Sequence, residues 1–335
     1  MGVTKRQRKN CSPAKAGSGK VPALPANPHR GPPTEKPISI EMFFSDHDGD
    51  RAKSLAGLRK SMVSLSSTGD IPEVDWVFVD HRNTKFFFAH FSGDYIPRRM
   101  SEKNQFYEAP FLNLLARLNE TGKVIIDGGA NIGNHSVFFA GVMRASVIAF
   151  EPQPFNFAFL RANVCLNRLE RQIHVRNIAI GDQPGHIDLE QLQPGNYGSF
   201  SADSDLLSSA PTGRSLEKFN ARVSTLDDEL SDMLDRISII KLDLEGMELA
   251  ALHGARRIIA QSTPVVAVEC FTRTVYQKVK EFLAAFDYFV VDSTNATPTF
   301  IFLSRRNPCH QELLSQYLEL SSLGKFESNN SFNER

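Results

Sequence analysis

The sequence lacks several features that would place the chain in a specialised class of protein. It contains no run of roughly 18 apolar residues, so we expect no membrane span. No charged segment leads into a short apolar one, so we expect no signal peptide. Acidic and basic residues number 38 each, and this balance gives no reason to expect nucleic acid or an anionic membrane as a partner.

Cysteine is also scarce. The four cysteines in 335 residues are Cys11, Cys165, Cys270 and Cys309. None lies near another, and no cysteine–histidine cluster has the spacing of a zinc site. We therefore expect reduced cysteines, a cytoplasmic protein and no bound metal.

Composition divides the chain into four segments. Residues 1–37 form a basic, proline-rich tail, which we expect to be disordered because it holds too little apolar surface to offset the entropy of ordering. A basic arm for nucleic acid or anionic lipid is the alternative. Residues 38–104 form an N-terminal segment with a β-hairpin, residues 105–308 form the main domain, and residues 309–335 form a polar C-terminal tail.

Strand and helix patterns alternate through the main domain, as is typical of a parallel sheet in an α/β fold. The hairpin upstream pairs residues 76–79 with 85–89 around a loop at 80–83, and a helix is expected at 105–119. Strands are predicted at 123–127, 146–150, 174–178, 238–242 and 265–269, helices at 133–142, 155–167, 226–234, 246–260 and 272–286, and a final antiparallel hairpin at 288–291 and 299–303.

The first of these strands runs into a glycine-rich turn. Residues 124–135 read VIIDGGANIGNH, and the glycines at 128, 129 and 133 allow close approach of the backbone to a ligand. Asp127 ends the strand and would repel a diphosphate. A ligand that carries both an ammonium and a carboxylate suits this arrangement better, and the methionine end of S-adenosylmethionine carries both.

Two further strand ends fit an adenosyl group. Glu151 follows the second strand, where a carboxylate can accept both ribose hydroxyls. Asn177, Ala179 and Asp182 lie at the end of the third strand, beside the expected position of the adenine. The glycine pattern read alone is a weak dinucleotide signal, because a strict G-x-G-x-x-G is missing.

Carboxylates gather after the fourth strand. Asp243 and Glu245 stand two apart at the strand end, at the mouth where ligands of such sheets bind. Glu248 stands in the first turn of the next helix, where an acid also complements the helix dipole. Lys241 lies two residues before Asp243 and can neutralise it.

The ordered set of these motifs resembles the FkbM family of methyltransferases. The resemblance covers about residues 107–269 and rests on the following stretches: Phe106-Tyr107-Glu108, residues 127–135, Phe150-Glu151-Pro152, residues 177–182, Thr225-Leu226-Asp227-Asp228 and residues 240–246. It implies a class I methyltransferase (Rossmann-like) fold, doubly wound α/β, with a seven-stranded, mostly parallel sheet and an antiparallel C-terminal strand. It also implies O-methylation of a hydroxyl on a saccharide or secondary metabolite, with S-adenosylmethionine as cofactor.

These arguments define a set of site residues. The expected catalytic residues are Asp243, Glu245 and His135; Glu245 and His135 are alternative general bases, and His135 can instead be a packing residue. A metal on Asp243, Glu245 and Glu269 is the less favoured alternative. The expected cofactor-binding residues are Asp127, Gly128, Gly129, Asn131, Gly133, Glu151, Asn177, Ala179, Asp182 and Asp243.

Several alternatives stay open at this point. An NAD(P)-dependent oxidoreductase and a non-catalytic binding protein with the same fold are the rival functions. The expected partner is a small-molecule or glycan acceptor, and a protein or RNA acceptor is a third possibility. Residues 195–201, with the polar stretch to about 215, are either a lid over the acceptor or an ordinary loop. The pattern does not indicate an oligomeric state.

Overall fold

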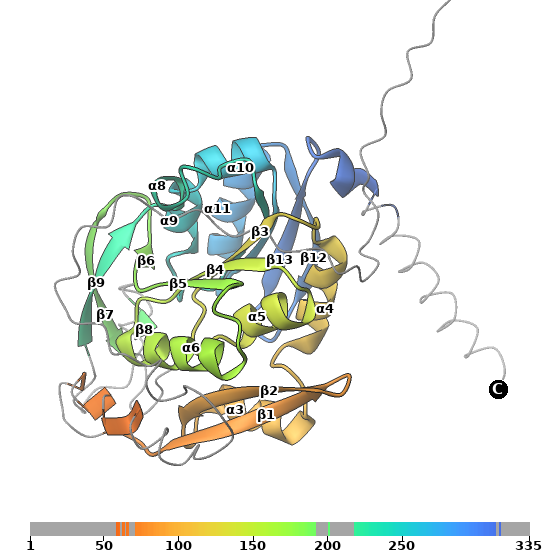
Figure 1. Cartoon of the computed structure of the whole chain (residues 1–335). Coiled ribbons are helices and arrows are strands. Elements are labelled where there is room, and N and C mark those ends of the chain that lie inside the picture. Colours follow the sequence, from red (N-terminus) through yellow and green to blue (C-terminus); the bar gives the residue numbers. More distant parts are fainter. Residues whose placement is uncertain are drawn as a thin grey trace, which may run out of the picture.

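A seven-stranded sheet forms the centre of the molecule (Figure 1). The computed structural model describes residues 58–60, 62–63, 65–66, 71–191, 200–201, 218–312 and 315. The strand order is β12-β13-β11-β10-β3-β4-β5. The strands are β3 (Val124–Gly128), β4 (Ser146–Phe150), β5 (Ile173–Arg176), β10 (Ile237–Leu242), β11 (Val265–Glu269), β12 (Tyr288–Thr294) and β13 (Thr299–Ser304).

The direction of the strands confirms the predicted fold class. β3, β4, β5, β10 and β11 pair in parallel, whereas β13 runs antiparallel to both β11 and β12. The sheet is therefore mostly parallel with an antiparallel last strand, as expected. The strand order reverses between β3 and β10, and a ligand of such a sheet binds beside this switch point.

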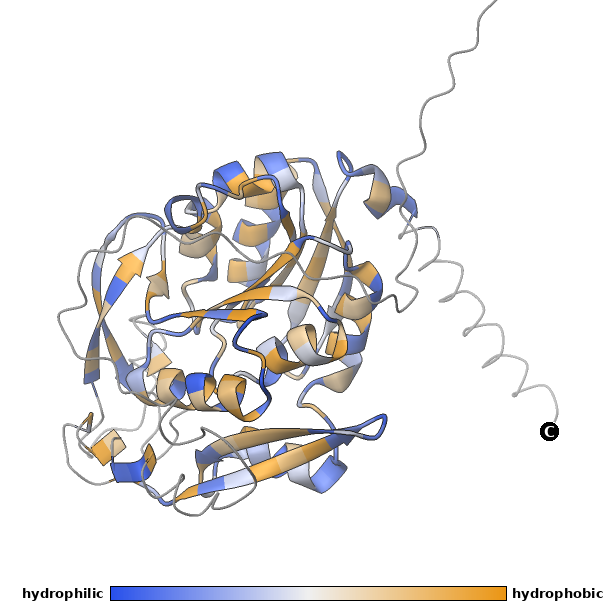
Figure 2. Ribbon diagram, viewed as in Figure 1, coloured by the Kyte–Doolittle hydropathy of each residue, from blue (hydrophilic) through white to orange (hydrophobic). Residues whose placement is uncertain are grey.

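Helices cover both faces of the sheet because side chains alternate along each buried strand (Figure 1). Ile125 of β3 packs into one core and Ile126 into the other. Hydrophobic residues accordingly run along the central strands in Figure 2. The first face is covered by α4 (Ala109–Leu118), α5 (Asn134–Val137), the π-helical turn η1 (Phe138–Val142) and α6 (Pro154–Leu166), and the second by α8 (Leu226–Glu229), α9 (Glu248–His253), α10 (Arg256–Ser262) and α11 (Arg273–Ala284).

Two predicted helices differ from the structure. α8 ends at Glu229 rather than continuing to residue 234. The helix expected at 246–260 is divided into α9 and α10 at Gly254. A side chain at Gly254 would lie 2.1 Å from the carbonyl oxygen of Gly181, so the glycine allows the chain to approach a neighbouring loop there.

Several elements were not predicted from the sequence. A four-stranded sheet with the order β6-β9-β7-β8 follows β5. Helix α3 (Tyr95–Lys103) precedes α4. The four strands of the additional sheet are β6 (Ala179–Ile180), β7 (Gly185–Gln191), β8 (Phe200–Ser201) and β9 (Lys218–Ser224). Most of the expected lid, residues 195–199 and 202–215, lies outside the described residues.

A hairpin of β1 (Val74–His81) and β2 (Thr84–Phe91) packs beside α6 (Figure 1). Its turn is shorter than the loop expected at 80–83, because only Arg82 and Asn83 lie outside the strands, both with positive φ. Two side chains of α6 make the hydrogen bonds to β2 that the backbone of a neighbouring strand would otherwise make. Asn163 and Asn167 each bind both backbone groups of one β2 residue, Ala89 and Phe87 respectively, at 2.6–3.1 Å.

This arrangement depends on two repeat distances that nearly match. Four residues along a helix rise about 6 Å, and two residues along a strand rise about 6.6 Å. The Asn163 amide also donates to the carbonyl of Ile132 at 2.7 Å, in the glycine-rich turn. The hairpin, α6 and the turn are therefore joined through one buried side chain.

The cysteines differ from expectation at one position. Cys165 and Cys270 are free, whereas Cys309 is disulfide-bonded. Disulfides are rare in reducing compartments, so the cytoplasmic location stays a prediction. Within the part of the chain that the structure describes, no helix combines the length and apolar character needed to cross a membrane.

We expect Asn163→Ala to lower the free energy of unfolding by about 3 kcal/mol, because it leaves buried backbone groups without partners. Urea denaturation measures this loss. Asn220→Ala is the control, because Asn220 is exposed and bonds only the Asp188 side chain; it should cost less than about 0.5 kcal/mol. Equal losses in the two variants would contradict the structural role of Asn163.

Candidate active site

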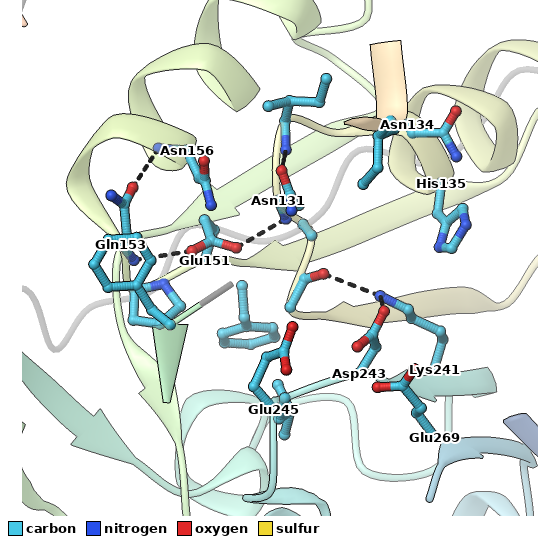
Figure 3. A pocket seen from close by; sticks show the side chains of 18 of the residues that line it. Asn131, Asn134, His135, Glu151, Gln153, Asn156, Lys241, Asp243, Glu245 and Glu269 are labelled. Atoms are coloured by element: carbon cyan, nitrogen blue, oxygen red, sulfur yellow. Dashed lines mark hydrogen bonds and ion pairs between the residues drawn. The ribbon is translucent and has the colours of Figure 1, made fainter. Parts of the chain in front are cut away.

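A cavity of about 400 Å³ opens at the carboxyl ends of β3, β4, β10 and β11 (Figure 3). Its wall includes the glycine-rich turn after β3, the loops after β4, β10 and β11, and the segment between α3 and α4. This is the position at which sheets with a reversed strand order bind their ligands, and the volume lies within the range of small-molecule sites.

Glu151 forms one end of the cavity (Figure 3). The backbone N–H of Asn131 donates to its Oε2 at 2.8 Å, and that of Gln153 donates to its Oε1 at 2.9 Å. Burial raises the pKa of Glu151 to about 7, against the opposing effect of these two hydrogen bonds. Each carboxylate oxygen has a second lone pair, so the group can still accept hydroxyls from a ligand.

The glycine-rich turn is held by its own hydrogen bonds. The N–H groups of Gly129 and Ala130 both donate to the Phe150 carbonyl at 3.0 Å, and the N–H of Gly133 donates to the Ala130 carbonyl. The turn packs closely on the loop after β10: a side chain at Gly129, where φ is +71°, would lie 1.8 Å from the Asp243 carbonyl oxygen. These amides consequently stabilise the turn rather than point to a ligand.

Asp127 lies beneath the cavity and not in its wall. Its side chain is fully buried, accepts a hydrogen bond from Ser136 Oγ at 2.6 Å and pairs with Lys241 Nζ at 3.2 Å. The structure thus places this carboxylate opposite a lysine of the protein. Sequence reasoning had assigned it to the ammonium of the ligand.

The ammonium of Lys241 joins β10 to β3 (Figure 3). It donates to the carbonyls of Gly128 at 3.2 Å and Gly129 at 3.0 Å, and Asp243 Oδ2 lies 3.8 Å away. Burial alone would lower the pKa of Lys241, but the carboxylates of Asp127 and Asp243 raise it above its ordinary value. The lysine therefore stays charged, and it is held by two backbone carbonyls and by the carboxylates of Asp127 and Asp243.

Carboxylates from two neighbouring strands form the opposite end of the cavity. Asp243, Glu245 and Glu269 all line it (Figure 3). Burial, and then the nearby Asp243 carboxylate, raise the pKa of Glu269 strongly and so favour the protonated form of Glu269. Among the described residues, no group of three or more His, Cys, Asp or Glu side chains is arranged so that it could hold a metal ion.

Glu248 has a structural role. Its Oε1 accepts hydrogen bonds from the backbone N–H groups of Leu244 at 2.7 Å and Gly246 at 3.3 Å. These bonds hold the turn in which Glu245 has a φ of +52°, a conformation that a non-glycine residue rarely adopts. Such strain is often found at functional sites.

The other predicted residues are divided between the wall and its support. Asn131, His135 and Ala179 line the cavity, whereas Gly128, Gly133, Asn177 and Asp182 do not. Asn177 supports the Glu151 loop, because its amide donates to the carbonyls of Glu151 and Pro152 at 2.9 and 3.1 Å.

Sequence reasoning missed several residues of the wall, including Asp94, Gln153 and Asn156. Burial raises the pKa of Asp94 to about 6. Gln153 is the N-cap of α6, because its Oε1 accepts the N–H of Asn156 at 2.6 Å, and its Nε2 is buried without a hydrogen-bond partner. Nothing in the sequence indicated that this amide faces the cavity.

The residues of the cavity fit an adenosyl cofactor with a cationic end. Glu151 can accept ribose hydroxyls, the apolar residues Ile178 and Ile180 line the cavity and suit an adenine, and the unpartnered Gln153 amide can donate to either group. The carboxylate-rich end suits the positive sulfonium and ammonium groups of S-adenosylmethionine.

The fold and this cavity together define a class I methyltransferase. The FkbM methyltransferase domain model matches residues 127–295, and the chain belongs to that family. This confirms the family resemblance and the cofactor, S-adenosylmethionine, that were expected from the sequence.

Two fungal proteins are similar to part of the chain. "Methyltransferase 1" of Beauveria bassiana is 25% identical over 142 residues, which are 39% of this chain and 57% of that protein. "Methyltransferase sdnD" of Sordaria araneosa is 28% identical over 153 residues, 39% of this chain and 59% of that protein. The chain thus spans less than two thirds of the length of these curated relatives.

Solved structures with a related fold include the FkbM methyltransferase of Methylobacillus flagellatus KT. It is 22% identical, covers 54% of this chain and 43% of that chain, and has a TM-score of 0.39. The 16S rRNA methyltransferase RsmC of T. thermophilus is 14% identical, covers 70% of this chain and 51% of that chain, and has a TM-score of 0.41.

Gly129→Ala should destabilise the protein by at least about 2 kcal/mol more than Gly122→Ala. Both glycines have positive φ, but a side chain at Gly122 meets nothing within 4 Å, whereas one at Gly129 collides with the Asp243 backbone. The control therefore measures backbone strain alone, about 1 kcal/mol. Thermal and urea unfolding of both variants test this, and similar losses would show that the contact with Asp243 yields easily.

Cofactor affinity should fall as the pH is lowered through about 7. The raised pKa of Glu151 means that the carboxyl becomes protonated below this pH, whereas the ionised form is the better acceptor for two ribose hydroxyls. Calorimetry with S-adenosylhomocysteine from pH 5.5 to 8 should show about a tenfold loss per unit below 7. Glu151→Gln removes the titrating group and should flatten the pH dependence of the affinity. If the variant keeps the same pH dependence, another residue is responsible for it.

Proposed function

We propose that this chain transfers the methyl group of S-adenosylmethionine to a hydroxyl of a small-molecule or glycan acceptor, on a saccharide or a secondary metabolite. Membership of the FkbM family supports the reaction class. The observation that carries the proposal is the position of Glu151, a buried carboxylate at the end of β4 that is oriented by two backbone amides at the cavity wall.

The cofactor would lie across the cavity. Glu151 accepts the ribose hydroxyls, and Ala179 with its neighbours borders the adenine. Asn131 and the carbonyl side of the turn at Gly129 border the methionine end. Asp243 and Glu245 then lie near the sulfonium and the acceptor. Figure 3 supports this division, because Glu151 lies on one side of the cavity and Asp243, Lys241 and Glu269 lie on the other.

The cofactor supplies an electrophilic methyl on a good leaving group. The protein must align the acceptor oxygen with the methyl, exclude water and take up the proton of the hydroxyl. Asp243, Glu245 and His135 are the groups in the wall that were expected to assist this step. Lys241 does not take the proton, because it is already charged.

A specific feature disfavours the rival oxidoreductase. A dinucleotide pyrophosphate is bound by free backbone N–H groups of a glycine-rich turn. Here the N–H groups of Gly129, Ala130 and Asn131 are already bonded to Phe150 and Glu151. A dinucleotide would have to break these bonds.

Calorimetric titration with S-adenosylmethionine, S-adenosylhomocysteine and NADH in parallel tests the cofactor. We expect both adenosyl ligands and not NADH to bind. Glu151→Ala should weaken the binding by about 10- to 100-fold, equivalent to about 1–3 kcal/mol. Glu170→Ala, an exposed control, should bind normally. Binding of NADH alone would favour the oxidoreductase, and binding of none of the three would favour a binding protein that has lost the chemistry.

Methyl-labelled S-adenosylmethionine with a panel of glycosides and hydroxylated metabolites tests the acceptor class. The label should enter a product that resists mild alkali, because methyl ethers are stable under conditions that hydrolyse methyl esters. Alkali-labile label would show that a carboxylate, and not a hydroxyl, is the acceptor.

A further inference from the structure

A histidine and a glutamate from separate elements meet at the wall of the cavity. His135 Nε2 lies 3.3 Å from Glu108 Oε2, and both residues line the cavity. His135 is 7% exposed, and its ring lies between those of Phe111 and Phe139, with centroids 5.7 and 6.3 Å away. The contact lies outside hydrogen-bond geometry, which is common before a substrate is bound.

The two ring nitrogens of His135 have different surroundings. Nε2 is sealed from solvent and faces Glu108. Nδ1 is not one of the buried, unpartnered atoms of the described residues, and His135 lines the cavity, so we assign Nδ1 to the cavity side of the ring. A carboxylate beside one nitrogen favours the proton on that nitrogen and leaves the other as a free acceptor.

The backbone holds Glu108 in this position. The Asn134 amide binds both backbone groups of Tyr107, accepting from its N–H and donating to its carbonyl, each at 3.0 Å. Glu108 itself has a φ of +58° and is the N-cap residue of α4. An unfavourable backbone conformation is thus maintained at the residue that faces His135.

We propose that His135 is the general base of this enzyme and that Glu108 positions it. Nδ1 of His135 accepts the proton of the acceptor hydroxyl while the oxygen bonds to the methyl and the methyl–sulfur bond breaks. Glu108 is a positioning residue that receives Nε2–H and balances the charge that forms on the imidazole. This inference rests on the proposed function, because it requires the cofactor methyl to lie near Nδ1.

The other groups of the wall are less suited to this role. Burial and the Asp243 carboxylate favour the protonated form of Glu269, and Asp243 Oδ2 lies 3.8 Å from Lys241 Nζ. Glu108 is paired with His135, and Lys241, Asp243 and Glu269 lie on the same side of the cavity in Figure 3. Of these groups, only His135 combines an imidazole nitrogen with an orienting carboxylate.

Sinefungin provides a test that needs no acceptor, because this cofactor analogue carries an amine at the position of the transferred methyl. S-adenosylhomocysteine lacks any group there. We expect His135→Phe to weaken the binding of sinefungin about tenfold and the binding of S-adenosylhomocysteine less than about twofold. Only the amine of sinefungin would contact Nδ1. Glu151→Ala is the control and should weaken both ligands equally.

Either of two results would overturn the proposal. An equal loss of affinity for both ligands in His135→Phe would show that His135 binds the methionine carboxylate, which the two ligands share. No loss for either would remove His135 from the site. If the unmodified protein binds neither ligand, the proposed function itself fails, and this outcome is distinct from both.

Nitrogen-15 NMR of labelled histidines tests the role of Glu108. At alkaline pH the His135 signal, identified by its absence in His135→Phe, should show a proton on Nε2 and none on Nδ1. Glu108→Gln should abolish this preference, whereas Asp94→Asn, which removes another carboxylate of the same wall, should leave it unchanged. A proton on Nδ1, or no change in Glu108→Gln, contradicts the positioning role.

Discussion

The buried ammonium of Lys241 is the interaction on which the site depends. It lies at the point where the strand order reverses, between β10 and β3, and takes the carbonyls of Gly128 and Gly129 together with the carboxylate of Asp127. A buried charge is tolerated only with such partners. The lysine thereby determines the course of the glycine-rich turn, and the turn in turn determines which atoms of the protein face the cavity.

The turn then orients the two ends of the cavity. Its close approach to Asp243 requires a glycine at 129, and its Asn131 amide holds the Glu151 carboxylate. The carboxylates after β10 and β11 leave one end of the cavity negative, whereas the end around Ile178 and Ile180 is apolar. An adenosyl group with a cationic tail matches this distribution of charge. We therefore propose that the site recognises its cofactor through the shape and charge of the wall, because the backbone amides of the turn are already bonded within the protein.

Much of the fold was predictable because buried parallel strands and their helices leave strong periodic patterns. β4 and β11 begin and end at the predicted residues, and the ends of β3 and β10 differ by one residue. The break at Gly254 and the additional sheet of β6–β9 were not predictable, because they depend on contacts between loops that are distant in sequence. Asn163 is a similar case: in the sequence it is one polar residue in an apolar helix, and only the packing of β2 against α6 explains it.

The sequence by itself determined the fold class, the family and the positions of Glu151, Asp243 and Glu245 at strand ends, because these follow from local patterns and from the rule that parallel strands end at one edge of a sheet. The tertiary structure alone decided which of the polar residues face the cavity. Asp127 was expected to bind the ammonium of the ligand, but in the structure its carboxylate pairs with Lys241 beneath the cavity. Glu108 lies 27 residues before His135 in the sequence, yet its Oε2 is 3.3 Å from His135 Nε2. The burial and the partner of a charged group depend on long-range packing, and spacing along the chain does not record them.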